Sequence, residues 1–118
     1  MKLLISGFES FDGLKINPSQ QMVEALQKLY FEDSLEIKDL SLRSVILPVS
    51  FARSFEVLKK EIDEFAPECV VAMGLAFSRE EITVERVGIN FLDAEIADNE
   101  GTQPRSQRLV VTELHFRK

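Results

Sequence analysis

The chain has 118 residues, of which 45% are hydrophobic and 29% are charged, and its net charge is −6. This length and composition are typical of one soluble globular domain with a modest core. The acidic balance, without any run of lysine or arginine, argues against nucleic acid and anionic membrane surfaces as partners.

The first part of the sequence predicts a strand followed by a helix. Residues 2–8 are mostly apolar, which is typical of a strand buried on both faces. In the next stretch, Asn17 is a good helix N-cap and Pro18 suits the first helical position. Apolar residues then recur at helical spacing, namely Met22, Val23, Leu26, Leu29 and Tyr30.

A second strand and a second helix are predicted next. In residues 35–49 apolar and polar residues alternate, and the alternation shifts by one position twice. This pattern predicts either one long bulged strand or two short strands. Pro48 indicates that this strand ends at a sheet edge or outside the sheet. Ser50 can cap a helix that ends before Pro67. The predicted buried side of this helix consists of Phe51, Phe55, Leu58, Ile62 and Phe65.

The run "CVVAMGLA", which begins at Cys69, is continuously apolar and predicts a central parallel strand. The order strand, helix, strand, helix, strand predicts a single α/β domain with a twisted, mostly parallel sheet flanked by helices. Alternation over residues 82–96 predicts extended structure or a hairpin near the strand ends, and "DNEGTQP" predicts a loop.

Two loops are expected at the edge where open α/β sheets bind ligands, "GFESFDG" and "GLAFSREE". In the first, Phe8 and Phe11 suit an apolar slot for a small flat group, or they simply pack beneath the loop. A phosphate site fits less well, because Glu9 and Asp12 would repel the ligand and no Gly-Lys-Ser/Thr follows. The sequence predicts no cofactor and no metal site.

Glu85 is a second candidate, because it lies between apolar residues in "ITVERVGIN". One interpretation is a surface ion pair with Arg86 or another base. The other is a partly buried carboxylate that orients a histidine.

Six stretches in the same order resemble the pyroglutamyl-peptidase I (pyrrolidone-carboxylate peptidase) family. They are "GFESFDG", "INPS", "LPVSF", "VVAMGLA", "ITVERVGIN" and "DAEIADNEGTQP". The resemblance covers residues 1–104, which we interpret as the amino-terminal part of such a domain. Residues 105–118 form a divergent tail with four basic residues and one acid.

The resemblance implies a cytoplasmic cysteine peptidase that removes pyroglutamyl residues from the N-termini of peptides, often as a homo-oligomer. It places Phe8 and Phe11 in the pyroglutamyl pocket and makes Glu85 the acid of a Glu–Cys–His triad. In that triad a thiolate attacks the amide carbonyl, histidine transfers the proton, and the acid orients the imidazole. A loop that accepts a flat, uncharged lactam ring needs aromatic residues and no lysine.

The resemblance does not include the half of the family's chain that carries the catalytic cysteine and histidine. Cys69 is expected to be a buried, inert strand residue, because a strand interior does not lower the pKa of a thiol. His115, the only histidine, lies in the divergent tail. Phe77 stands where the family has a small residue and could crowd the slot.

Three hypotheses follow. The first is the amino-terminal part of a pyroglutamyl peptidase, inactive alone. The second is a non-catalytic binding or oligomerisation module that keeps the pocket, and the third is an enzyme that uses Cys69 and His115. Because two helices cannot cover both faces of such a sheet, an uncovered face or edge strand is expected to favour association.

Overall fold

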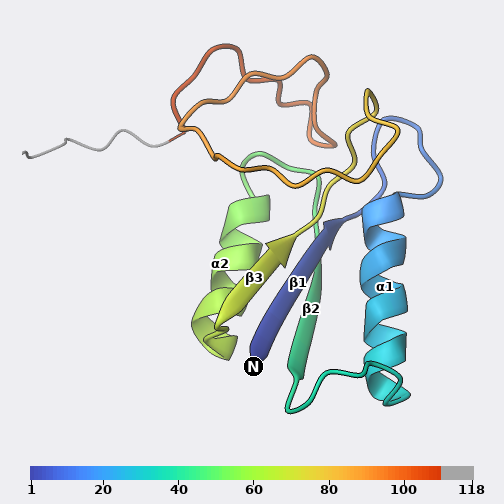
Figure 1. Ribbon diagram of the computed structural model, residues 1–118. Helices are drawn as coiled ribbons and strands as arrows, with labels where there is room; N and C mark the ends of the chain where they lie inside the picture. Colours follow the sequence, from blue (N-terminus) through green and yellow to red (C-terminus); the bar gives the residue numbers. More distant parts are fainter. Residues whose placement is uncertain (110–118) are drawn as a thin grey trace, which may run out of the picture.

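The computed structural model describes residues 1–109, and its elements alternate between strand and helix (Figure 1). They are β1 (Lys2–Phe8), α1 (Pro18–Phe31), β2 (Ser41–Leu47), α2 (Ser54–Phe65) and β3 (Cys69–Ala72). The strands form one parallel sheet in the order β2-β1-β3. The predicted α/β domain, with a parallel sheet flanked by helices, is confirmed.

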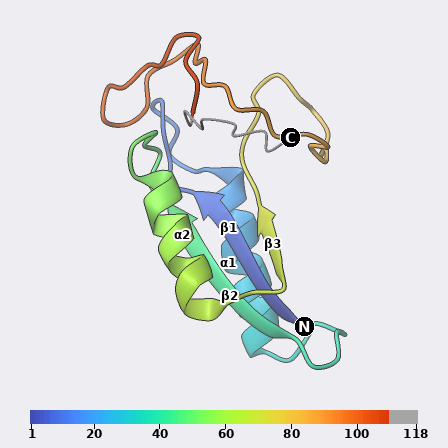
Figure 2. The same ribbon diagram turned by 90° about the vertical axis from the view of Figure 1, so that its left-hand side faces the viewer.

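The two helices lie on opposite faces of the sheet, as the two perpendicular views show (Figures 1 and 2). The chain leaves the central strand β1 towards β2 and then crosses β1 to reach β3. Because parallel crossovers are right-handed, this reversal of direction puts α1 and α2 on different faces. The same reversal opens a crevice where the loops after β1 and β3 diverge.

The core is centred on β1, which is buried from Leu4 to Gly7, as its apolar sequence predicts. Val23 from α1 and Leu47 from β2 complete it, with 1% and 3% of their surface exposed. Gly7 makes this packing possible, because a Cβ atom there would lie 2.5 Å from the carbonyl oxygen of Ser19. The start of α1 therefore rests directly on the backbone of β1.

Helix α1 begins where the sequence predicts. The Oδ1 atom of Asn17 accepts a hydrogen bond from the amide of Ser19 at 3.0 Å, and Pro18 occupies the first helical position. The Oγ atom of Ser19 accepts a hydrogen bond from the amide of Phe8 at 2.9 Å. This bond fixes the end of β1 to the first turn of the helix.

The region between the helices differs from the prediction. Only Ser41–Leu47 forms a strand, so neither one long bulged strand nor two short strands is present. Asp39 has a φ of 55°, and this left-handed turn ends the extended run before β2 begins. Helix α2 begins at Ser54, whereas Ser50 accepts a hydrogen bond from the amide of Arg53 at 3.1 Å in the turn before the helix.

The predicted buried face of α2 is only partly buried. Phe55 is 66% exposed and Phe51 precedes the helix, whereas Leu58, Ile62 and Phe65 are half-buried. The reason lies in the small area of contact, because within residues 1–109 α2 packs on β2 and β1 and not on β3.

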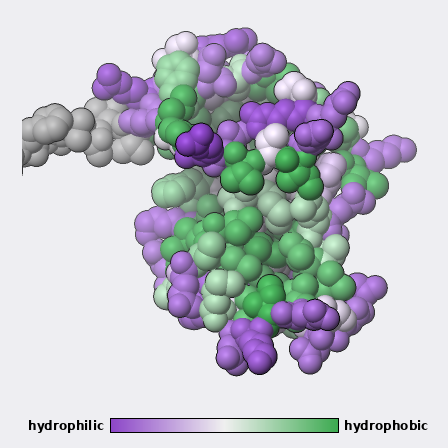
Figure 3. All heavy atoms as spheres, viewed as in Figure 1, coloured by the Kyte–Doolittle hydropathy of each residue, from purple (hydrophilic) through white to green (hydrophobic). Residues whose placement is uncertain are grey.

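Strand β3 is an edge strand, which corrects the prediction of a buried central strand. It pairs with β1 alone, and within residues 1–109 neither helix packs on it. Cys69 is exposed rather than buried, and Val70 and Val71 are 39% and 42% exposed. Figure 3 shows hydrophobic side chains gathered over the strands between the two helices.

Residues 75–109 lie above the carboxyl ends of the strands (Figure 1). The alternating stretch 82–91 has no strand partner among the described residues, and Ile82 and Val84 are 87% and 88% exposed. Of the two predicted alternatives, extended structure or a hairpin, the hairpin is absent within residues 82–96; Leu92 instead forms one antiparallel bridge with Gln107, with hydrogen bonds of 2.7 and 2.9 Å. Neither helix in the described part of the chain has the length and hydropathy needed to cross a bilayer.

Candidate binding site

A pocket with a volume of about 270 Å³ opens at the carboxyl edge of the sheet. Its wall comes from the segments that follow all three strands and from the loop near residue 98. The lining residues are Phe8, Phe11, Asn17, Val49, Ser50, Phe51, Ser54, Gly74, Leu75 and Asp98. The pocket therefore occupies the crevice that the reversal of strand order creates.

Phe8 and Phe11, the two aromatic residues predicted from the sequence, both line this pocket. Phe8 is the last residue of β1. Phe11 lies in the following loop and contacts Phe77, with ring centroids 5.5 Å apart and planes tilted by 58°. Phe77 is not among the lining residues, so it supports Phe11 instead of filling the slot.

The loop that carries Phe11 is held by its own turn and by α1. Asp12 and Gly13 have φ angles of 52° and 72°, which reverse the chain after Phe11. Asn17 is 1% exposed and donates from Nδ2 to the carbonyl oxygen of Glu9 at 2.9 Å. The same side chain thus caps the helix and fixes the pocket loop, a role that the N-cap pattern alone does not reveal.

Asp98 supplies the charged group at the pocket. Its Oδ2 atom accepts a hydrogen bond from the amide of Phe51 at 2.8 Å, and its Oδ1 atom accepts from the amides of Glu100 and Thr102 at 2.9 and 2.8 Å. Partial desolvation raises the pKa of this carboxyl, but these hydrogen bonds together outweigh it and hold the pKa below the ordinary value of 3.8. Asp98 is therefore ionised at neutral pH.

Glu100 anchors the same loop to the turn before α2. Ser50 donates to Oε2 of Glu100 at 2.5 Å, and Arg53 donates from Nη1 to Oε1 at 2.9 Å. The hydrogen bonds from Ser50 and Arg53 hold the pKa of Glu100 below its ordinary value. The pocket thus combines apolar walls with a fixed negative charge, which favours a small uncharged ligand over an anion.

Glu85 lies apart from the pocket lining. Its side chain is 72% exposed and forms an ion pair with Arg79. The expected partial burial between apolar neighbours is absent, because the residues around it in segment 82–91 are themselves exposed. The ion-pair interpretation agrees with this geometry, with Arg79 as the base instead of Arg86.

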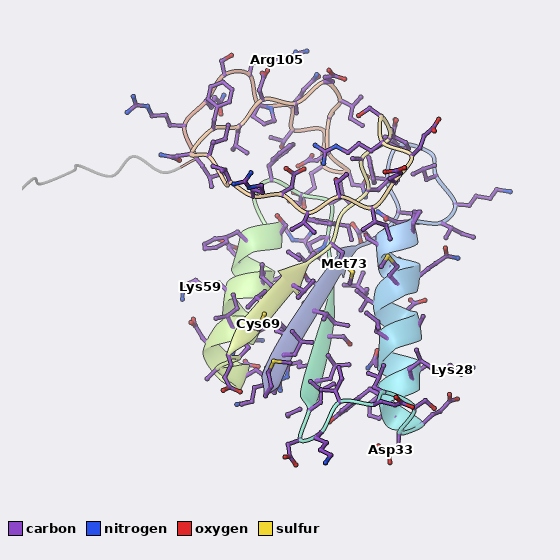
Figure 4. The ribbon with its side chains drawn as sticks, viewed as in Figure 1. Lys28, Asp33, Lys59, Cys69, Met73 and Arg105 are labelled. Atoms are coloured by element: carbon purple, nitrogen blue, oxygen red, sulfur yellow. The ribbon has the colours of Figure 1, made fainter. Side chains whose placement is uncertain are left out.

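Cys69 lies at the other end of the sheet from the pocket. It pairs with Leu3, whereas Phe8 is five residues further along β1, roughly 16 Å at the rise of a strand. Figure 4 shows Cys69 in the first part of β3 and Met73 at the end nearest the loops. His115 lies outside the described residues. Within residues 1–109, no group of three His, Cys, Asp or Glu side chains could hold a metal ion.

Comparison with known proteins identifies the family to which this fold and pocket belong. The family model described as pyroglutamyl peptidase matches residues 1–113. The chain belongs to the pyroglutamyl peptidase family. The resemblance in the six sequence stretches is thereby confirmed, whereas the division of the chain at residue 104 remains a prediction.

Individual family members agree with this assignment. The pyrrolidone-carboxylate peptidase of Pyrococcus furiosus is 38% identical over 110 residues, and that of Bacillus cereus strain AH820 is 42% identical over 102 residues. The crystal structure of the pyrrolidone carboxyl peptidase from Fervidobacterium islandicum AW-1 matches 93% of this chain with a TM-score of 0.83 at 34% identity. The enzyme of Thermococcus litoralis matches 91% with a TM-score of 0.77 at 40% identity.

The matches cover nearly all of this chain but only part of each relative. They span 50% of the Pyrococcus furiosus protein and 45% of the Bacillus cereus protein. The chain thus spans about half the length of the curated relatives that it matches. Its fold is that of a pyroglutamyl peptidase over this half.

Proposed function

We propose that this chain forms the pyroglutamyl-binding part of a cytoplasmic cysteine peptidase that removes N-terminal pyroglutamyl residues from peptides. The observation that carries the proposal is the pocket lined by Phe8 and Phe11 in a member of the pyroglutamyl peptidase family. Aromatic side chains suit a flat lactam ring. Asp98 supports a preference for a pyroglutamyl peptide over free pyroglutamate. Its negative charge repels the free carboxylate of pyroglutamate but not the amide of the peptide.

The proposed reaction needs a cysteine and a histidine that the described residues do not bring to the pocket. A thiolate adds to the amide carbonyl beside the lactam, and an imidazolium donates the proton with which the amine leaves. Water then releases pyroglutamate from the thioester. Because Cys69 lies at the opposite end of the sheet, we propose that this chain alone binds the pyroglutamyl group without hydrolysing the peptide bond.

Glu85 is our candidate for the acid of the triad. It is exposed and forms an ion pair with Arg79. In the triad role, the Glu85 carboxylate would have to leave Arg79 and bind a histidine instead. The polypeptide that brings the histidine would also have to exclude water from the pair, because the interaction is weak in a high dielectric.

Titration of the purified chain with L-pyroglutamyl amide, followed by heteronuclear NMR, tests the pocket. We expect shift changes confined to residues around Phe8 and Phe11, and weaker changes with free pyroglutamate. Phe11→Ala should weaken binding about tenfold, because the ring loses one of its two aromatic walls. Phe31→Ala, which alters an exposed aromatic residue at the end of α1, is the matched control and should leave binding unchanged.

Hydrolysis of a fluorogenic pyroglutamyl amide, assayed on the same sample, tests the catalytic part of the proposal. We expect no turnover. Turnover that disappears in Cys69→Ser would identify Cys69 as a nucleophile and overturn our assignment. A folded chain that shows no shift changes with L-pyroglutamyl amide would overturn the pocket assignment itself.

A non-catalytic binding or oligomerisation module is the second candidate, and the open edge of β3 favours it. The two candidates can be separated by adding a second polypeptide. This polypeptide is the half of a relative's chain to which the present chain has no match. Restored turnover supports a peptidase part. Binding of L-pyroglutamyl amide without restored turnover supports a module that retains only the pocket.

A further inference from the structure

The loop of residues 98–101 contacts both sides of the pocket through two neighbouring residues. Asp98 accepts a hydrogen bond from the amide of Phe51 at 2.8 Å, on the side formed after β2. Asn99 reaches the opposite side, where its Nδ2 atom donates to the carbonyl oxygen of Ser10 at 2.9 Å and to Oε1 of Glu9 at 3.2 Å. One short loop therefore holds the walls that carry Phe51 and Phe11.

Glu9 is the point at which these contacts meet. Its Oε1 atom accepts a hydrogen bond from the amide of Val49 at 3.1 Å as well as the bond from Asn99. The amide of Asn99 in turn donates to the carbonyl oxygen of Val49 at 3.0 Å. Glu9, Val49 and Asn99 thus form a closed triangle of hydrogen bonds, which we call the clasp.

The clasp is placed where it can control the pocket. Glu9 and Ser10 lie between Phe8 and Phe11 in the sequence, and Val49 itself lines the pocket. A shift of Asn99 therefore moves the backbone next to both aromatic residues. Because Glu9 accepts with a carboxylate, its bonds are stronger than those between neutral groups.

We propose that Asn99 is a positioning residue for the pocket, which through Glu9 sets the separation between the wall of Phe11 and the wall of Phe51. This inference rests on the proposed function, because it treats the pocket as the pyroglutamyl site. Asn99 does not line the pocket and acts on it through the clasp and its bond to the Ser10 carbonyl oxygen.

Asn99→Asp and Glu9→Gln test the clasp with almost no change of shape. Asn99→Asp replaces the donating amide by an oxygen that faces the Glu9 carboxylate and the Ser10 carbonyl. We expect about tenfold weaker binding of L-pyroglutamyl amide and about fivefold faster hydrogen exchange at the Val49 amide, from the loss of hydrogen bonds to a charged group. Glu9→Gln keeps an acceptor oxygen, so its affinity should stay within about threefold of the wild type.

The double variant gives the decisive readout. With Gln at position 9, the repulsion between two carboxylates disappears, although the oxygen that accepts from the Val49 amide still faces the new Asp at position 99. We expect Glu9→Gln to restore part of the affinity lost in Asn99→Asp, because it removes the charge repulsion, while exchange at the Val49 amide stays faster than in the wild type. Gln27→Glu, which adds the same charge on an exposed position of α1, is the control and should change neither.

The alternative outcomes are distinguishable. Unchanged exchange at Val49 in Asn99→Asp, or no rescue in the double variant, would overturn the clasp. Equal acceleration of exchange throughout β1 and α1 would also overturn it, because Asn99 would then be a general stability residue. If the wild type does not bind L-pyroglutamyl amide, the proposed function fails, while exchange at Val49 still decides whether the clasp exists.

Discussion

Two buried serines, Ser6 on β1 and Ser19 in the first turn of α1, differ in their hydrogen bonding. Ser19 donates to Oδ1 of Asn17 at 2.8 Å and accepts from the amide of Phe8 at 2.9 Å. The Oγ atom of Ser6, on the central strand, is fully buried and has no hydrogen-bond partner among the described residues. A buried hydroxyl without a partner costs stability, whereas a bonded one contributes to it.

We therefore expect opposite effects from the same substitution. Ser6→Ala should raise the free energy of unfolding by about 1 kcal/mol, because it removes an unsatisfied polar atom. Ser19→Ala should lower it by about 2 kcal/mol, because the amide of Phe8 and the side chain of Asn17 both lose a partner. Urea unfolding followed by circular dichroism measures both. A destabilising Ser6→Ala would show that its hydroxyl is bonded, for example to an internal water.

At this scale the sequence identifies the residues that act locally and misses those that act at a distance. Phe8, Phe11 and Asn17 lie within ten residues of one another, so their strand end, loop and helix cap can be read from one stretch. Asp98 and Asn99 reach the same pocket from a loop whose turn residues give no indication of its partners. Glu85 has apolar neighbours in the sequence, but they are exposed and do not bury it.

Among the elements, α2 ends at a residue with an unfavourable backbone conformation. Ala66 is the C-cap and has φ and ψ angles of 48° and 60°, in the left-handed region. The "AP" pair predicts the end of the helix, since the residue before proline avoids the helical region. It does not predict the left-handed cap, a conformation that glycine adopts more readily than alanine.

Ala66→Gly should therefore stabilise the protein. We expect the free energy of unfolding to rise by about 1 kcal/mol, since glycine removes the strain of the left-handed Cβ. Ala25→Gly, at an exposed position within α1, is the control and should destabilise by about 1 kcal/mol. Similar losses in both variants would contradict the strain at Ala66.

The elements that the sequence predicts least well are those that lack a neighbour. The apolar run from Cys69 predicts a strand correctly but places it at the centre of the sheet. An apolar sequence shows that a strand can be buried, but it does not show whether other elements cover it. The alternation over residues 82–91 does not lead to a hairpin for the same reason, since an extended segment becomes a strand only when another strand pairs with it. By contrast, β1 and α1 contact each other directly, and their predictions are confirmed.

At the scale of the whole molecule, apolar side chains are exposed on β3 and on the segment that follows it in the described part of the chain. Val70 and Val71 on β3 are exposed beside a strand edge that has no partner within residues 1–109. In the segment that follows β3, the side chains of Ile82, Val84, Val87 and Ile89 are also exposed. Open strand edges and exposed apolar side chains favour association with another chain.

Sedimentation velocity over a range of concentrations tests this expectation. We expect the wild-type chain to associate as its concentration rises, and Val71→Lys to shift the transition to about tenfold higher concentration by placing a charge on the edge strand. Phe31→Lys adds the same charge to an exposed residue of α1, away from β3, and should have little effect. A wild type that stays monomeric throughout would contradict the role of this edge.

The contact between Glu9 and Asn99 joins positions ninety residues apart. During translation, all three strands and both helices are encoded before Asn99 is reached. At roughly 5–20 residues per second, the 27 residues from Ala72 to Asn99 take a few seconds to synthesise. Asn99 is therefore synthesised after every strand of the sheet, so the pocket walls can gain this contact only once the residues of all three strands have been made.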